Sequence, residues 1–243
     1  PQNVNNLIVQ NAYVFILATG MLFCILTGGN IDLSVGSVVC FVGAVGGKMM
    51  VTNEMNPYLS IIVMLLVGLL IGAWQGFWIA YVRIPPFIVT LAGMLVFRGL
   101  SNVVLEGMTL APMPDNFLAL FNNYIPDFFG MEGFNMTCFL VGVVVCVLYV
   151  FMVLKGRASR AKKGYRVEPF GGVLIKMIVI CAAVLAFMFR LAQYKGIPNS
   201  LVWIVLVIAV YTYIASKTTV GRYFYAVGGN EKATKLSGIN TNR

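Results

Sequence analysis

The chain of 243 residues is 60% hydrophobic and 10% charged, with a mean hydropathy of +0.89. A soluble domain carries about a quarter of charged residues, so this composition excludes a soluble globular protein and indicates one embedded in a membrane. The net charge of +9 does not indicate nucleic acid, because the basic residues lie between apolar spans, as positive-inside topology requires. With no histidine and five cysteines scattered through apolar runs, we expect no metal, no cofactor and no disulfide framework.

The first apolar run, from Leu7 to Val51, carries only two charges, Asp32 and Lys48. As one helix its 45 residues would measure about 67 Å, more than twice the ~30 Å hydrocarbon core of a bilayer. The run therefore has to break, and the glycines and polar side chains of 28–32 mark the place.

Seven apolar segments are long enough to cross a bilayer. We predict crossings at about 7–28, 33–51, 57–82, 85–107, 136–154, 173–194 and 198–216. The fold class is therefore an all-α, polytopic transmembrane helical bundle. Because the chain does not begin with Met and stops in a polar stretch, we expect residues 1–243 to be a single transmembrane domain, truncated from a longer polypeptide.

The loop charges assign the two sides of the membrane. The loop 155–171 and the tail 217–243 are basic and are predicted to be cytoplasmic, whereas 108–135 is acidic and is predicted to be external. The basic residues of the first loop are Lys155, Arg157, Arg160, Lys162, Lys163 and Arg166. The acids around the external loop are Glu106, Asp115, Asp127 and Glu132. By alternation Arg83 is cytoplasmic and Glu54 external.

Three details stay open. The 28–32 turn faces the cytoplasm if both flanking crossings are complete, or Asp32 sits deeper if 33–51 is partly re-entrant. The proline- and aromatic-rich loop 108–135 is either a short interfacial helix or a plain loop. Arg98 either snorkels to the outer surface or pairs with Glu106.

Polar residues gather around the break. Asn30 or Asp32 can cap the next helix, and the hydroxyl groups nearby can face a polar path. One interpretation is a capped turn at the membrane surface, and the other is an element that lines a translocation path, because carboxylates inside membranes are costly. The candidate path residues are Thr27, Asn30, Asp32, Ser34, Ser37 and, on a later crossing, Thr90. Further candidates are Trp74, Gln75 and Trp78.

The tail predicts one short helix. Gly228 and Gly229 are expected to break the chain, Asn230 to cap a helix of two turns or fewer, and Gly238 to end it. Such a helix is not stable alone, so a partner surface or the membrane supports it, unless the stretch is a solvated loop. No Gly-x-x-x-x-Gly-Lys-Ser/Thr sequence occurs, so we expect no enzymatic activity and no ATP hydrolysis by this chain.

The chain resembles the permease subunits of bacterial monosaccharide ABC importers, the ribose, galactose and xylose group. Three segments carry the resemblance and occur in the same order as in that family: 27–37, 84–100 and 221–239. The sequence at 72–85 and the basic loop most resemble the multiple-monosaccharide branch. The resemblance covers essentially the whole chain, and it implies further helices after 221–239.

The resemblance implies a subunit of the bacterial inner membrane that passes a monosaccharide from a periplasmic sugar-binding protein into the cytoplasm. The implied partners are a separate ATP-binding subunit, a second permease copy in a homo- or heterodimer, and the lipid bilayer, with no nucleic acid. It implies that 228–238 contains the helix that couples to the ATPase. The residues concerned are Gly228, Gly229, Asn230, Glu231, Ala233, Leu236, Ser237 and Gly238.

The alternative function is an ion-coupled carrier or a passive channel for a small polar solute. A carrier needs buried ionisable clusters, which the sequence does not display. Composition alone does not exclude a channel.

Overall fold

The computed structural model describes residues 2–130, 133–165 and 167–241. Over these residues the chain is helical, and no strand forms beyond one isolated bridge between Tyr124 and Pro198. The helices are α1 (Gln2–Leu26), α2 (Val35–Gly47), the π-helical η1 (Lys48–Thr52), α3 (Pro57–Ala80), α4 (Pro86–Leu105), α5 (Asp115–Asn122), α6 (Met136–Lys162), α7 (Phe170–Ala192), α8 (Asn199–Lys217), α9 (Thr219–Gly229) and α10 (Glu231–Leu236). The predicted all-α class is confirmed.

Within the described residues seven helices are long and apolar enough to cross a membrane, and each overlaps one of the seven predicted crossings. They are α1, α2 continued by η1, α3, α4, α6, α7 and α8. Large apolar side chains such as Leu65, Leu69 and Val103 are about 70% exposed. Helices that are apolar on their outer faces need a lipid environment, so this is a multi-pass membrane protein.

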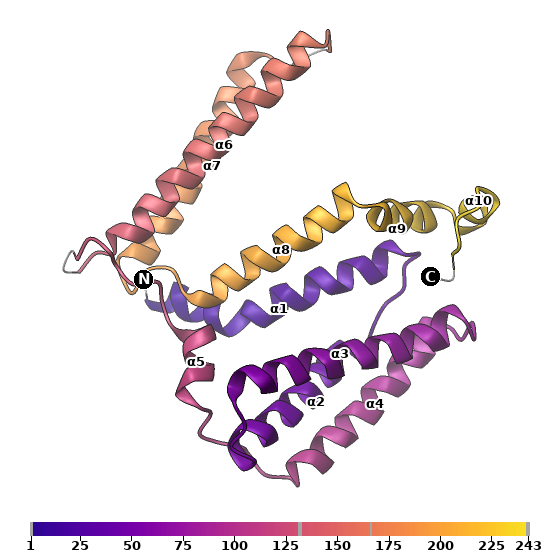
Figure 1. Cartoon of the computed structure of the whole chain (residues 1–243). Helices are drawn as coiled ribbons and strands as arrows, with labels where there is room; N and C mark the ends of the chain where they lie inside the picture. The colour runs from indigo at the N-terminus through magenta and orange to yellow at the C-terminus, as the bar shows by residue number, and fades with distance from the viewer. Residues whose placement is uncertain (1, 131–132, 166, 242–243) are drawn as a thin grey trace. The chain divides into compact units, whose positions relative to one another are not determined.

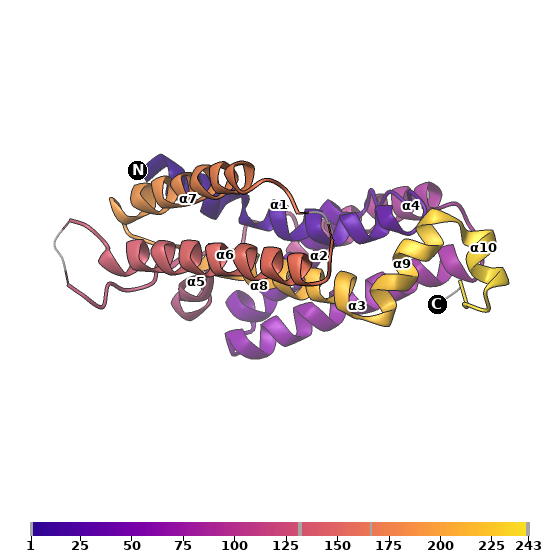
Figure 2. The ribbon, with the colours of Figure 1, turned by 90° about the horizontal axis from the view of Figure 1, so that it is seen from above.

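The chain divides into two compact units. Unit 1 comprises Pro1–Ala12 and Asn122–Val202, and unit 2 comprises Tyr13–Phe121 and Trp203–Arg243. In unit 1, α6 and α7 run side by side as a hairpin (Figure 1 and Figure 2). Gly142 lets them approach, because a Cβ there would lie 2.8 Å from Cγ of Met188.

The core of unit 1 lies where α6 and α7 meet the loop before α8. Its fully buried members are Cys138, Leu191, Ala192 and Ile197, and apolar residues of the first turns of α1 pack against them. Asn135 caps α6, since its Oδ1 accepts a hydrogen bond from N of Cys138 at 2.8 Å.

Unit 2 is built on α2, which packs against both α3 and α4. Its interior-facing glycines make this possible. At Gly46 a Cβ would overlap the side chain of Met64 on α3, and Gly47 lies against the side chain of Leu110. Small residues at such positions let helix backbones approach where no hydrophobic effect drives association.

Several details differ from the sequence-based expectations. A helix, α5, forms in the 108–135 loop, so the plain-loop alternative is wrong. The ion-pair partner of Glu106 is Lys48 and not Arg98, and α6 runs to Lys162, eight residues past the predicted end. The predicted loop residues Glu132 and Arg166, and the last two residues of the tail, lie outside the described residues.

Candidate functional site

The glycine-rich break between α1 and α2 is closed by local hydrogen bonds. The Thr27 hydroxyl donates to the Cys24 carbonyl at 2.8 Å, and Asn30 Nδ2 donates to the Thr27 carbonyl at 3.2 Å. Gly28 and Gly29 have φ angles of 112° and 79°, in the region that favours glycine. The two glycines therefore let α1 end and the chain turn within a few residues.

Asp32 organises the start of α2. Its Oδ1 accepts hydrogen bonds from N and Oγ of Ser34, at 2.8 and 2.6 Å. Of the two capping residues that the sequence allows, Asp32 thus bonds to the start of α2, whereas Asn30 bonds back to the end of α1.

The hydrogen bonds continue into α3. Gln75 Nε2 donates to Ser34 Oγ at 2.9 Å, and the two side chains are 5% and 0% exposed. A chain of hydrogen bonds therefore runs from Gln75 through Ser34 to Asp32. The buried side chains of Ser34 and Gln75 thus satisfy each other, as a low-dielectric interior demands.

The fourth helix closes over this network. A Cβ on Gly93 would overlap Nε2 of Gln75 and lie 3.5 Å from Cβ of Ser34. On the same face of α4, the buried Thr90 hydroxyl lies 3.4 Å from the carbonyl of Ile31 within the break. Gly93 is therefore needed for the space that Gln75 occupies.

The network lies inside the helix ends. Gln75 comes five residues before the end of α3, about 8 Å along the axis, and Gly93 seven residues after the start of α4, about 10 Å. The segment after the break is also an 18-residue candidate span. The segment is therefore long enough for a complete crossing, whereas the depth of Asp32 in the membrane stays a prediction.

The tail forms two helices where the sequence predicts one. The predicted break lies one residue later than expected, because both Gly228 and Gly229 belong to α9, which ends at Gly229, and the extended residue Asn230 separates it from α10. The helix begins at Thr218, whose Oγ1 accepts from N of Gly221 at 3.2 Å. Gly221 packs on backbone, since a Cβ there would overlap the carbonyl oxygens of the last turn of α8.

The predicted short helix, α10, is confirmed with its cap. Asn230 Oδ1 accepts from N of Ala233 at 3.0 Å, and Gly238 follows the helix with a φ of 84°. The buried Thr234 hydroxyl donates to the Ala226 carbonyl at 2.8 Å, which ties α10 to α9. Leu236 is 89% exposed at the end of α10.

Helix α9 contacts the end of α1, where the break begins. A Cβ on Gly228 would overlap the carbonyl oxygen of Leu26, lie 3.0 Å from its carbonyl carbon and lie 3.7 Å from N of Gly28. The ring centroids of Phe23 and Phe224 are 5.3 Å apart beside this contact. The last turn of α1 therefore rests against the backbone of α9.

A second link joins α10 to the turn between α3 and α4. Arg83 Nη1 lies 3.7 Å from Glu231 Oε1, and both side chains are more than half exposed. An exposed ion pair at this distance contributes little to stability, but it shows that α10 lies close to the turn between α3 and α4.

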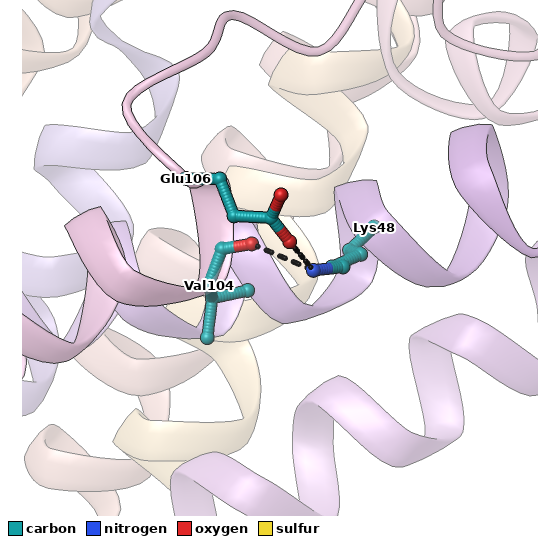
Figure 3. Close-up of polar contacts among 3 residues, drawn as sticks. All are labelled: Lys48, Val104 and Glu106. Carbon is teal, nitrogen blue, oxygen red and sulfur yellow. Dashed lines mark hydrogen bonds and ion pairs between the residues drawn. The ribbon is translucent and has the colours of Figure 1, made fainter.

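At the other end of α2, Lys48 joins η1 to α4 (Figure 3). Its Nζ lies 2.7 Å from Glu106 Oε1 and 3.2 Å from the Val104 carbonyl. A cation at a helix C-terminus is favourable, because the last carbonyls carry partial negative charge. The hydrogen bond from Lys48 and its positive charge lower the pKa of the Glu106 carboxyl from its ordinary 4.5.

Most predicted path residues are brought together around the break. They are Thr27, Asn30, Asp32, Ser34 and Thr90. Ser37 is half-buried on the first turn of α2, separate from that hydrogen-bonded chain. Sequence reasoning did not identify the role of Gly93, which leaves space for the Gln75 side chain. A glycine one turn after Thr90, on the same helix face, could have indicated this close approach. Among the described residues, no group of three or more acidic, cysteine or histidine side chains could hold a metal ion.

Comparison with known proteins identifies the family. The family model described as branched-chain amino acid transport system / permease component matches residues 3–243. The chain belongs to this family.

Named relatives include sugar permeases. Over its whole length the chain is 36% identical to the xylose transport system permease protein XylH of Escherichia coli K12, covering 59% of that protein. It is 31% identical to the ribose import permease protein RbsC of Haemophilus influenzae, and the match covers 99% of the chain and 54% of that protein. It is 28% identical to the inner membrane ABC transporter permease protein YjfF of Escherichia coli K12, and the match covers 97% of the chain and 51% of that protein. The chain thus spans little more than half of these relatives, and no solved structure matches it. The resemblance to monosaccharide ABC permeases is confirmed.

Proposed function

We propose that this chain is part of the permease subunit of an ATP-driven importer that moves a monosaccharide into the cytoplasm across the bacterial inner membrane. The observation that carries the proposal is the contact of Gly228 with the Leu26 carbonyl. It joins the α9–α10 pair, which lies outside the candidate spans, to the polar break between α1 and α2.

The α9–α10 pair is suited to receive a push from a partner. Thr218 caps α9, Gly221 sits on the last turn of α8, and Thr234 ties α10 to α9, so the pair moves as one piece. Leu236 projects from it almost fully exposed, and an isolated large apolar side chain on a six-residue helix suits a docking pocket. We propose that a separate ATP-binding subunit docks here, through the coupling residues 228–238.

The ion pairs support the proposed sides of the membrane. Arg83 and Glu231, both predicted to be cytoplasmic, lie 3.7 Å apart, and Lys48 lies at the end of α4 with the predicted external Glu106. The loops 155–171 and 217–243 are accordingly proposed to be cytoplasmic and 108–135 external, where a periplasmic sugar-binding protein delivers its cargo. A second permease copy, identical or related, completes the pore of this transmembrane domain.

The break provides suitable chemistry for a neutral sugar. Hydroxyl and amide groups from Thr27, Asn30 and Thr90 lie around it, and they bind sugar hydroxyls without the desolvation cost of a full charge. When α10 moves, Gly228 displaces Leu26, and the hydrogen bonds among Asp32, Ser34 and Gln75 determine how far the displacement spreads.

Leu236→Asp in the full-length protein tests the docking step. We expect the ATP-binding subunit to be lost on copurification, because a charge cannot enter an apolar pocket without losing its hydration. Leu118→Asp on α5 is the matched control, a leucine on another short helix predicted to lie on the opposite side. Equal copurification of the ATPase with both variants would contradict the docking proposal.

Uptake tests the transport function itself. Cells that express the full operon are given a panel of radiolabelled monosaccharides, with and without this subunit. We expect ATP-dependent uptake of at least one sugar, lost when the subunit is deleted. Uptake abolished by a proton uncoupler at constant ATP would indicate an ion-coupled carrier instead, and energy-independent equilibration would indicate a channel.

A further inference from the structure

A charged cavity lies in unit 1, between the joined ends of α6 and α7. It measures about 340 Å³. Among the residues that the structure describes, three cations line it, Arg157 and Arg160 from α6 and Lys176 from α7, together with one acid, Glu168. The count leaves two positive charges in excess around one hollow.

The internal contacts of these groups leave the two guanidinium charges unbalanced. Lys176 Nζ lies 2.7 Å from Glu168 Oε2, so that carboxylate is already paired. Arg157 donates to the backbone carbonyl of Glu168, a neutral acceptor, and stacks over the ring of Phe170 at 5.6 Å. The hydrogen bond from Lys176, with its charge, lowers the pKa of Glu168, so the acid stays ionised and its pairing persists at neutral pH.

The other wall of the cavity is apolar. Met152 and Val153 precede the arginines on the same face of α6, and Met177 follows Lys176 on α7. Gly156 lies between the apolar and the basic residues, and no atom would come within 4 Å of a Cβ placed there. The hollow is therefore open at its middle, with a basic rim on one side and methylene and methyl groups on the other.

The position along α6 matches the depth of a phospholipid head group. The helix has 27 residues, about 40 Å, which exceeds the ~30 Å hydrocarbon core. Arg157 comes 21 residues after Met136, about 32 Å along the axis, so it reaches the polar layer of the membrane. Met152 and Val153 come earlier on the helix and lie in the acyl layer. Outward residues of both helices, such as Val147 and Ile178, are about 60% exposed and need lipid around them.

We propose that this cavity binds one anionic phospholipid, with its phosphate held by Arg157 and Arg160 and an acyl chain against Met152 and Val153. Guanidinium groups bind phosphate oxygens through paired N–H donors. Basic pockets between membrane helices on the cytoplasmic side suit anionic head groups. The inference is independent of what the protein transports.

Native mass spectrometry of the detergent-solubilised, full-length transporter tests the site. The probes are phosphatidylglycerol, phosphatidylcholine and inorganic phosphate, each added at the same concentration. We expect preferential retention of phosphatidylglycerol. Arg160→Gln should weaken it about fivefold, the contribution of one basic residue near an anionic head group.

Two matched controls separate the cavity from general surface charge. Lys162→Gln removes a cation from the same helix end outside the cavity lining, and it should leave binding unchanged. Gly156→Leu fills the hollow, whereas Gly171→Leu adds the same side chain at an equally open helical glycine of α7 outside it. Only Gly156→Leu should reduce retention.

Three results would overturn the proposal. The first is equal retention of phosphatidylcholine and phosphatidylglycerol. The second is equal loss of binding in Gly156→Leu and Gly171→Leu, or in Arg160→Gln and Lys162→Gln. The third is binding of inorganic phosphate with no lipid preference, which would make the cavity a site for a soluble anion.

Discussion

The two ends of the helix group α2, α3 and α4 are held in different ways. At one end Lys48 bonds to Glu106 and to the last turn of α4 through a flexible side chain. At the other end Gly93 of α4 packs against the side chain of Gln75 on α3, and next to the break the backbone of Gly228 on α9 lies against the Leu26 carbonyl of α1. Exposed ion pairs tolerate drift, whereas backbone contacts through glycine transmit any displacement. This difference supports the proposed route, in which a movement of α9 is passed through Gly228 to the end of α1 and the break.

The largest expected effect is that of Gly228→Ala in the assembled transporter. The new Cβ would force α9 away from Leu26, although alanine favours a helix over glycine by up to about 1 kcal/mol. Overpacking costs about 1–3 kcal/mol, which corresponds to about 5- to 150-fold, so we expect sugar uptake to fall by about tenfold while the ATP-binding subunit still copurifies.

Gly229→Ala is the control for this change. It is the next residue of the same helix, and a Cβ there would meet no atom within 4 Å. Uptake should equal that of the wild type. Equal uptake by both variants would show that contact with Leu26 does not matter for transport.

A smaller effect is expected for Gly93→Ala. The added methyl group displaces the Gln75 amide and breaks its hydrogen bond to the buried Ser34 hydroxyl. An unsatisfied buried group costs about 1–3 kcal/mol, so the midpoint of thermal unfolding in detergent should fall. Gly99→Ala, at an open position of the same helix, should raise the midpoint or leave it unchanged. Similar midpoints for both variants would show that Gln75 can move at no cost.

The smallest effect concerns Glu106→Gln. Because the pKa of Glu106 is lowered in the folded protein, its pair with Lys48 contributes stability above the ordinary carboxyl pKa of 4.5. That contribution is lost as the pH falls through the lowered value. The difference in unfolding midpoint between wild type and variant should thus persist from pH 7 to 5 and vanish at lower pH.

Glu54→Gln provides the comparison for Glu106→Gln. It neutralises another exposed acid near the end of η1, and the Lys48 pair stays intact. At pH 7 its effect on the unfolding midpoint should be smaller than that of Glu106→Gln, because it leaves the Lys48–Glu106 ion pair in place. A difference for Glu106→Gln that grows on acidification would reverse the sign of the proposed contribution.

The helices were predicted well from the sequence. All seven spans, the cap at Asn230 and the short helix after it follow from apolar length and local hydrogen-bonding capacity. The behaviour of Gly228 and Gly229 was not predicted, because glycine is compatible with both a turn and a close helix contact. The backbone of Leu26 decides between these, and it is 202 residues away in sequence.

The partners of charged residues were equally beyond sequence reasoning. Glu106 was within reach of Arg98 along its own helix, yet it pairs with Lys48, which comes from η1. Helical periodicity shows which residues share a face, but not which other helix covers that face.

The sequence by itself determined that the chain is a polytopic helical membrane protein with polar residues at one break, since hydrophobic length and backbone hydrogen bonding leave no other way to span a bilayer. Only the tertiary structure decided that Asp32, Ser34 and Gln75 form one hydrogen-bonded chain and that α9 rests on the end of α1. These contacts depend on which helices pack together, and local sequence carries no information about a distant partner.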